Sequence, residues 1–192
     1  AQNYHKTLDE NRYYDVAAFI GGPLCNYNHV ERYYINGDST INGKVYKKMY
    51  AHDFITDHSG PFCPPFVIKN ESYFSGILLR EDTVEKRLYR YREGKDEYLL
   101  SDYSLDVGDS LEVFENDFMK IIDKQIITLE NGEERTKFVL ENFEYYIEGI
   151  GNSQGLFNIN SQGLGFWNES ICIKENGENL IGNECQYRFV GI

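Results

Sequence analysis

The stretch Tyr33-Tyr-Ile-Asn-Gly-Asp-Ser-Thr-Ile-Asn-Gly-Lys-Val-Tyr-Lys-Lys-Met-Tyr50 predicts the fold class of this chain. Two Asn-Gly pairs, at residues 36–37 and 42–43, separate short runs of aromatic and β-branched residues. Asn-Gly is favoured in tight hairpin turns because both turn positions take a positive φ, which these two residues tolerate best. The stretch therefore predicts three strands joined by two turns, a β-meander.

The same pattern extends in both directions along the chain. Residues 15–20 form an apolar run, residues 87–92 alternate with the two-residue period of a strand, and Asn-Gly pairs recur at residues 131–132 and 176–177. Helical periodicity is absent except for one possible turn around residues 111–118. We predict an all-β fold, an antiparallel meander of hairpins that forms a barrel or a two-sheet sandwich with little helix.

Length and charge limit the organisation and the partners. The 192 residues are consistent with one β-domain, residues 1–192, in which the polar residues 1–14 form a flexible N-terminal arm or a short helical turn. The net charge of −12 repels nucleic acids and anionic membranes, so we expect no nucleic-acid partner. Without a long apolar run or a leader at its start, the sequence reads as a mature secreted chain whose leader has been removed, and no transmembrane helix is predicted.

The chain has four cysteines: Cys25, Cys63, Cys172 and Cys185. They contain no Cys-x-x-Cys pair and lack histidines at zinc-finger spacing, which argues against a structural zinc site. We predict two disulfide bridges, Cys172 to Cys185 and Cys25 to Cys63, formed in an oxidising compartment such as a periplasm or the cell exterior. Four reduced, buried thiols are the alternative, and the sequence leaves three connectivities open.

Residues 143–157 combine a strand, an acidic residue and a glycine-rich turn. Glu148 lies between apolar residues, an environment that raises a carboxyl pKa as a general acid requires. We prefer a structural interpretation, in which this carboxylate accepts backbone N–H bonds and pins the glycine turn. Ser153 fits the letters of the Gly-x-Ser-x-Gly nucleophile elbow, but no helix signal follows it, so no catalytic residue is predicted.

Two groups of residues have side chains of the kind that bind metal ions. The first is Asp38, Asp102, Asp106 and Asp109, whose spacing does not match a calcium-binding D-x-D-x-D-G loop. The second is His52, Asp53, Asp57 and His58, in a Pro/Gly-rich segment at no standard metal spacing. We interpret the aspartates as turn residues and the second group as part of a surface loop at residues 52–65, and predict no metal site and no cofactor.

Aromatic residues exceed what a core of this size needs. The sequence has 16 Tyr and 12 Phe, and adjacent pairs such as Tyr145-Tyr146 must point to opposite faces of a strand. About half of the rings should therefore face outward or into a second layer, where they could line a groove for sugars or for an apolar ligand. Glu148, Tyr146 and Trp167 are our candidate ligand-binding residues.

Several segments together resemble a known family. They are residues 37–50, 73–82, 97–109 and 146–157, followed by the cysteine pair 172 and 185 around Glu175-Asn-Gly177. In this order the chain resembles, over roughly residues 30–190, a β-rich module of Bacteroidetes secreted and cell-envelope proteins, among them lipoproteins and proteins with C-terminal sorting domains. The resemblance implies a secreted or envelope location and carries no catalytic residue.

The chain also departs from that family pattern. Ser101 stands where aromatic or small residues often precede the aspartate, and no sorting domain is present, so a lipid anchor lost with the leader is the expected means of retention. Taken together, these features favour a non-enzymatic secreted or envelope-associated module that binds an unknown ligand or protein. A lipocalin-like binder with an aromatic-lined cavity is the alternative, and a carboxylate-dependent hydrolase is a more remote one.

Overall fold

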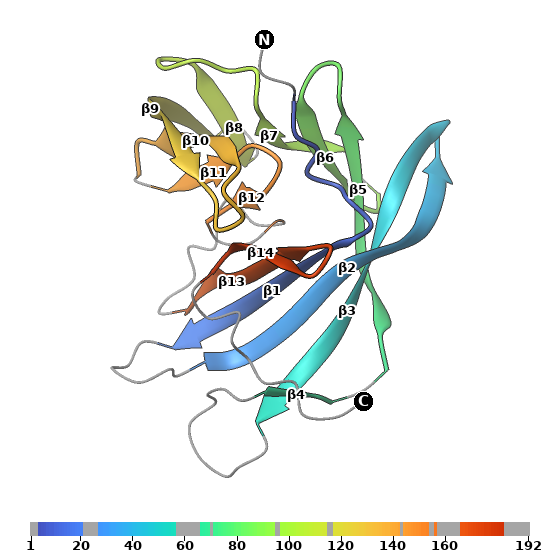
Figure 1. Ribbon diagram of the computed structural model, residues 1–192. Coiled ribbons are helices and arrows are strands. Elements are labelled where there is room, and N and C mark those ends of the chain that lie inside the picture. Colours follow the sequence, from blue (N-terminus) through green and yellow to red (C-terminus); the bar gives the residue numbers. More distant parts are fainter. Residues whose placement is uncertain are drawn as a thin grey trace.

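The computed structural model describes residues 4–20, 27–56, 66–69, 71–94, 97–114, 117–142, 144–153, 156 and 166–182. These residues form β-strands, turns and connections without any helix, which confirms the all-β prediction. Figure 1 shows a long, curled sheet with a smaller sheet beside one end of it. The strands of the large sheet are β1 (Arg12–Ile20), β2 (Tyr27–Ile41), β3 (Lys44–Thr56), β4 (Phe66–Ile68), β5 (Tyr73–Asp82), β6 (Arg87–Tyr91), β7 (Tyr98–Asp102), β13 (Phe166–Glu175) and β14 (Glu178–Ile181).

The strand order combines a meander with one return of the chain. The large sheet has the order β14-β13-β1-β2-β3-β5-β6-β7, with β4 paired to β3, so the last hairpin of the described chain packs beside the first strand. The small sheet has the order β12-β11-β10-β9-β8. Its strands are β8 (Ser110–Phe114), β9 (Asp117–Thr128), β10 (Glu134–Leu140), β11 (Tyr145–Ile147) and β12 (Gly151–Asn152). All the described pairings are antiparallel, as predicted.

Two of the predicted Asn-Gly turns are confirmed. Asn42 and Gly43 join β2 to β3 with φ values of 51° and 76°. Asn176 and Gly177 join β13 to β14 with φ values of 51° and 85°. Two successive positive φ angles are what a two-residue type I′ hairpin requires, so the local sequence is sufficient to form these turns.

The turn predicted at residues 36–38 is wrong, because β2 runs through it as a single strand. The register between β2 and β3 shifts between Ile35 and Asp38, and Gly37 takes a φ of 80°. β3 continues as a partner on both sides of this point, so one extra residue is accommodated as a β-bulge instead of a reversal. Bulges bend a strand and increase its twist, which fits the curvature of the large sheet.

The helical turn predicted around residues 111–118 is also wrong. Residues 110–114 and 117–128 are β8 and β9, paired with Leu111 opposite Met119. Leu111 and Met119 are buried, whereas Glu112 and Phe118 are exposed. This alternation is the two-residue period of strands. The apolar residues are three to four positions apart in the sequence because the chain turns between β8 and β9, and not because they share one face of a helix.

The main core lies between the two sheets. It combines side chains of the large sheet, such as Tyr14 and Met49, with side chains of the small sheet, such as Phe138 and Tyr146. The rings of Phe138 and Tyr146 stack with centroids 4.6 Å apart and planes 2° apart. A second, smaller core combines Ala17, Val30 and Phe54 of β1, β2 and β3 with Phe66 of β4, which pairs with β3.

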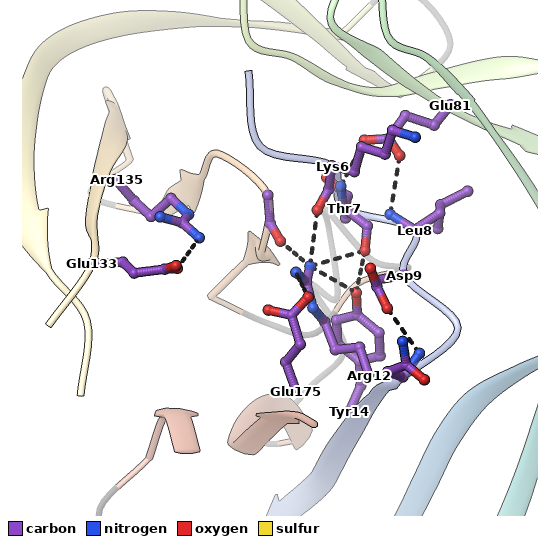
Figure 2. A network of polar contacts seen from close by, with 12 residues as sticks. Lys6, Thr7, Leu8, Asp9, Arg12, Tyr14, Glu81, Glu133, Arg135 and Glu175 are labelled. Atoms are coloured by element: carbon purple, nitrogen blue, oxygen red, sulfur yellow. Dashed lines mark hydrogen bonds and ion pairs between the residues drawn. The ribbon is translucent and has the colours of Figure 1, made fainter. Parts of the chain in front are cut away.

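Residues 4–14, the described part of the segment predicted as a flexible arm or a short helical turn, are packed against the fold, and Arg12 to Tyr14 belong to β1. The Arg12 side chain is buried, and its Nη1 donates to the carbonyl oxygens of Lys6 (3.1 Å), Thr7 (3.0 Å) and Gly149. Its Nη2 donates to Glu175 Oε1 at 3.2 Å. Figure 2 shows this guanidinium at the centre of the network that connects the N-terminal segment, β1 and β13.

A carboxylate holds the same segment from the other side. Glu81 of β5 accepts hydrogen bonds from the Tyr4 hydroxyl (2.6 Å) and from the backbone N–H groups of Thr7 (2.6 Å) and Leu8 (3.0 Å). Backbone donors and acceptors that belong to no strand are satisfied in this way by two charged side chains. The N-terminal segment was predicted to be an arm because it is polar. Its polar groups instead make the hydrogen bonds that hold it against the fold.

Candidate functional site

Strands β1, β2, β3 and β5 present two faces with different chemistry. One face carries Tyr14 and Met49 into the main core. Because side chains alternate along a strand, the neighbouring residues Tyr13 and Tyr50 point to the opposite face. One face carries a row of aromatic rings, and the other carries a cluster of polar side chains.

An unbroken row of four rings crosses the face that points away from the main core. The strand register places Tyr13 beside Tyr34, Tyr34 beside Tyr50, and Tyr50 beside Phe74. The ring centroids are 6.3, 6.2 and 5.8 Å apart, and the planes are tilted by 42–56°. We call these four residues the aromatic row. Its two ends are open to solvent, with Tyr13 42% and Phe74 44% exposed.

Polar and charged groups flank the aromatic row on the same face. His52 stacks on Tyr34 with centroids 5.6 Å apart. The Arg32 guanidinium lies 5.3 Å from the Tyr13 ring centroid and makes two hydrogen bonds of 2.7 Å to the carboxylate of Asp15. A cation over a ring and a bidentate ion pair both restrict side-chain motion, so one end of the row is held in place.

The opposite face carries a cluster of polar side chains beyond the end of the main core. The Tyr33 hydroxyl donates to Glu31 Oε2 at 2.6 Å, and the Tyr73 hydroxyl lies 2.7 Å from Glu31 Oε1 and 2.8 Å from Asp53 Oδ1. His29 Nε2 lies 3.5 Å from Glu31 Oε1 and 3.7 Å from Asp53 Oδ1. We call these five residues the inner polar cluster. Glu31 and Asp53 are direct cross-strand partners on β2 and β3, which explains why two carboxylates meet here.

Hydrogen bonding controls the protonation of this cluster. Burial raises the pKa of Glu31, but hydrogen bonds from His29, Tyr33 and Tyr73 outweigh burial and bring that pKa to about 2. The hydrogen bond to Glu31 raises the pKa of His29 above its ordinary value. Burial, and then the hydrogen bonds to carboxylates, raise the pKa of the Tyr33 and Tyr73 hydroxyls. Both tyrosines therefore stay protonated and donate.

A ligating nitrogen and two ligating carboxylate oxygens meet in this cluster. His29, Glu31 and Asp53 each offer one such atom, and the three atoms lie within 4.8 Å of one another. From the sequence, Asp53 was predicted to lie with His52 in a surface loop. β3 instead continues to Thr56, so His52 and Asp53 point to opposite faces, while Asp57 and His58 lie outside the described residues. The missed signal was the His-x-Glu pattern at residues 29 and 31, which places both side chains on one face of a strand.

The residues that were predicted from the sequence to bind a ligand belong neither to the aromatic row nor to the inner polar cluster. Tyr146 is buried in the main core, where its hydroxyl donates to the Asp102 carbonyl oxygen at 2.9 Å, so it cannot line an open site. Glu148 is also buried and accepts a hydrogen bond from the backbone N–H of His5 at 3.3 Å. It thus holds the N-terminal segment, where the sequence predicted that it would hold its own turn. The Trp167 side chain lies outside the described part of the chain.

Ser153 lies directly after the short strand β12, and its backbone N–H donates to the Tyr145 carbonyl oxygen at 2.9 Å. This hydrogen bond extends the antiparallel pairing of β11 with β12, and residues 154–155 and 157–165, which follow it, lie outside the described part of the chain. Tyr145 and Tyr146 point to opposite faces, as predicted, since Tyr146 is buried and Tyr145 is only partly buried beneath the Lys137 ammonium.

The four aspartates considered for calcium are engaged with cations or with turns. Asp38 pairs with Lys47 (3.0 Å), Asp102 with Arg87 (2.7 Å) and Asp106 with Lys124 (2.7 Å). Asp109 accepts a hydrogen bond from the backbone N–H of Asp106 at 2.9 Å. Asp106 and Asp109 flank the turn at residues 107–108, as interpreted from the sequence, whereas Asp38 and Asp102 lie in β2 and β7 and are ion-pair residues.

Cys172 is buried in β13, and no cysteine is free among the described residues. Cys25, Cys63 and Cys185 lie outside the described part of the chain, so the pairing of the four cysteines stays a prediction.

None of the described residues form a helix that could cross a bilayer. Comparison with protein-family models, with curated proteins and with solved structures finds no match for this chain. The aromatic row and the inner polar cluster, on the two faces of strands β1, β2, β3 and β5, are the candidate functional sites of the described residues.

Proposed function

We propose that this protein is a non-enzymatic binding module and that the aromatic row is its ligand-binding surface. The observation that supports the proposal most directly is the continuity of the row: four rings from four neighbouring strands lie next to one another, with the end rings 42% and 44% exposed. Exposed rings scattered singly are ordinary on a protein surface, but a contiguous row held by flanking charges is a feature of recognition surfaces.

The ligand class follows from the shape and charge of this face. Flat rings in a line offer apolar contact to a ligand with flat C–H faces, while His52 and the partly exposed Arg32 guanidinium, which the buried Asp15 holds in place, lie at the edge. Aromatic rings can also stack on nucleic-acid bases, but the net charge of −12 opposes binding of any polyanion. A neutral polysaccharide chain combines C–H faces with hydroxyl groups, and we propose it as the ligand.

A location outside the cytoplasm is part of the same proposal. It is supported by the resemblance to secreted and cell-envelope modules and by four cysteines that could pair in an oxidising compartment. The lipocalin-like alternative has less support, because Tyr146 and Phe138 stack on each other inside the core and leave the outer rings as those available to a ligand.

Affinity electrophoresis tests this proposal directly. The protein is run through native gels that contain soluble neutral glucan, xylan or mannan, with anionic alginate as a charge control. We expect at least one neutral polysaccharide to retard the protein, and the double variant Tyr13→Ala/Phe74→Ala to lose most of that retardation. Val84→Ala is the matched control, because Val84 is 85% exposed in the connection between β5 and β6, away from the row.

Two outcomes would refute this assignment. Equal retardation of the double variant and the wild type would show that the row is not the binding surface. An absence of retardation by every neutral polysaccharide would reject the ligand class. Circular dichroism of each variant shows whether the sheet is intact, so that loss of binding is not confused with loss of folding.

A further inference from the structure

The inner polar cluster has the donors and the spacing of a metal site. Its ligating atoms are His29 Nε2, Glu31 Oε1 and Asp53 Oδ1, contributed by two adjacent strands. The nitrogen lies 3.5 and 3.7 Å from the two oxygens. A tetrahedral zinc ion with bonds near 2.1 Å separates its ligands by about 3.4 Å. The two nitrogen–oxygen distances are thus already close to this value, and all three ligating atoms lie within 4.8 Å of one another.

Tyrosine hydroxyls already contact the two carboxylates, and the single proton of the Tyr73 hydroxyl is donated to one of them at a time. The Tyr73 hydroxyl lies between Glu31 Oε1 and Asp53 Oδ1, and the Tyr33 hydroxyl donates to Glu31 Oε2. Each carboxylate oxygen has two lone pairs, so an oxygen that accepts one hydrogen bond can still bind a metal ion. Tyrosine hydroxyls placed in this way act as the outer partners that position ligands in known metal sites.

The cluster is also accessible enough to receive an ion. The side chains of His29, Glu31 and Asp53 are 46%, 22% and 20% exposed. They are thus partly shielded from water, but none is sealed in the core. The positive charge of Lys69 acts on His29 and that of Arg90 on Tyr33, and these are the cationic groups that oppose an added ion.

The ligand types select among metal ions. Calcium wants six to eight oxygen ligands, whereas this cluster offers one imidazole nitrogen and two carboxylates. Imidazole with carboxylates suits zinc and its first-row neighbours, and zinc accepts three protein ligands with a fourth position left for water or for a group from another molecule. We infer that His29, Glu31 and Asp53 form a binding site for a divalent transition-metal ion of the zinc type. This inference is independent of the aromatic row, which lies on the other face of the sheet.

Metal binding is tested with untagged protein that has been treated with a chelator and then dialysed. Zinc chloride is added in a calorimeter, and cobalt chloride is added in a spectrophotometer because cobalt in a tetrahedral site absorbs strongly in the visible range. We expect one zinc ion per chain and a cobalt spectrum that zinc abolishes. His29→Ala and Asp53→Asn should each weaken zinc binding by at least about 10-fold, and Tyr73→Phe by about 10-fold through loss of orientation.

His52→Ala is the matched control, because it removes a neighbouring histidine of β3 that points to the opposite face, and it should leave zinc affinity unchanged. The inference is overturned if zinc does not bind stoichiometrically. It is also overturned if His29→Ala and Asp53→Asn bind zinc as the wild type does, which would place the ion elsewhere, for example on thiols. Wild-type melting behaviour without metal confirms that each variant is folded.

Discussion

Replacing Arg12 by Met should release the N-terminal segment and cost much of the stability of the fold. The Arg12 side chain is only 3% exposed, and its guanidinium binds the carbonyl oxygens of Lys6, Thr7 and Gly149 together with the carboxylate of Glu175. Methionine fills a similar volume but donates no hydrogen bond. The substitution would leave three carbonyl oxygens without this donor and one carboxylate without its cation.

The expected cost can be estimated from these contacts. Removing one member of a buried charged network costs about 3–5 kcal/mol, because the partners remain desolvated. Glu175 is 21% exposed and can recover some hydration, which places the expected loss near the lower limit, at about 3 kcal/mol. For a domain of this size that loss corresponds to a decrease in melting temperature of about 6–12 °C.

Urea unfolding followed by fluorescence measures this loss, and hydrogen exchange locates it. The backbone N–H groups of Thr7 and Leu8 donate hydrogen bonds to Glu81. Their amide hydrogens should exchange faster in Arg12→Met than in the wild type. Glu175→Gln is the comparison variant and should cost less than Arg12→Met, because the glutamine oxygen still accepts from Arg12 and the three carbonyl oxygens keep their donor. A loss below about 1 kcal/mol in Arg12→Met, with an unchanged denaturant dependence, would refute the proposed role of Arg12 in holding the N-terminal segment.

Two further predictions concern a close contact and an acidic side chain. Both Gly149 and Gly43 have a positive φ, but a Cβ at Gly149 would lie 2.9 Å from His5 Cβ, whereas one at Gly43 meets nothing within 4 Å. Gly149→Ala should therefore destabilise the fold by at least about 1 kcal/mol more than Gly43→Ala. Equal costs in urea unfolding would contradict this close contact. The hydrogen bond from Arg80 lowers the pKa of Glu97 to about 2 from its ordinary 4.5. The stability that Glu97 contributes is therefore complete above pH 4.5 and is lost as the pH falls towards 2, so Glu97→Gln should be less stable at neutral pH and should approach the wild type near pH 2; parallel stability curves across this range would exclude the pairing.

Local turn chemistry made the fold class readable from the chain. Asn42-Gly43 and Asn176-Gly177 form hairpins because two adjacent positive φ angles are a property of those dipeptides. Strand alternation likewise showed that Tyr145 and Tyr146 would face opposite ways. The same local reasoning failed at residues 36–37, where a continuous partner strand turned an identical dipeptide into a bulge.

The aromatic row and the inner polar cluster could not be predicted in the same way, because they depend on which strands are neighbours. Tyr13, Tyr34, Tyr50 and Phe74 span 62 positions of sequence, from 13 to 74 inclusive, and become a row only through the register of β1, β2, β3 and β5. Glu31 meets Asp53 for the same reason. Hairpin propensity is a short-range property of a few residues, whereas register is set jointly by core packing and bulges along whole strands. The amino-acid sequence alone thus establishes an acidic, tyrosine-rich all-β chain, and the packed sheet decides that the aromatic row and the inner polar cluster lie on opposite faces of the same strands.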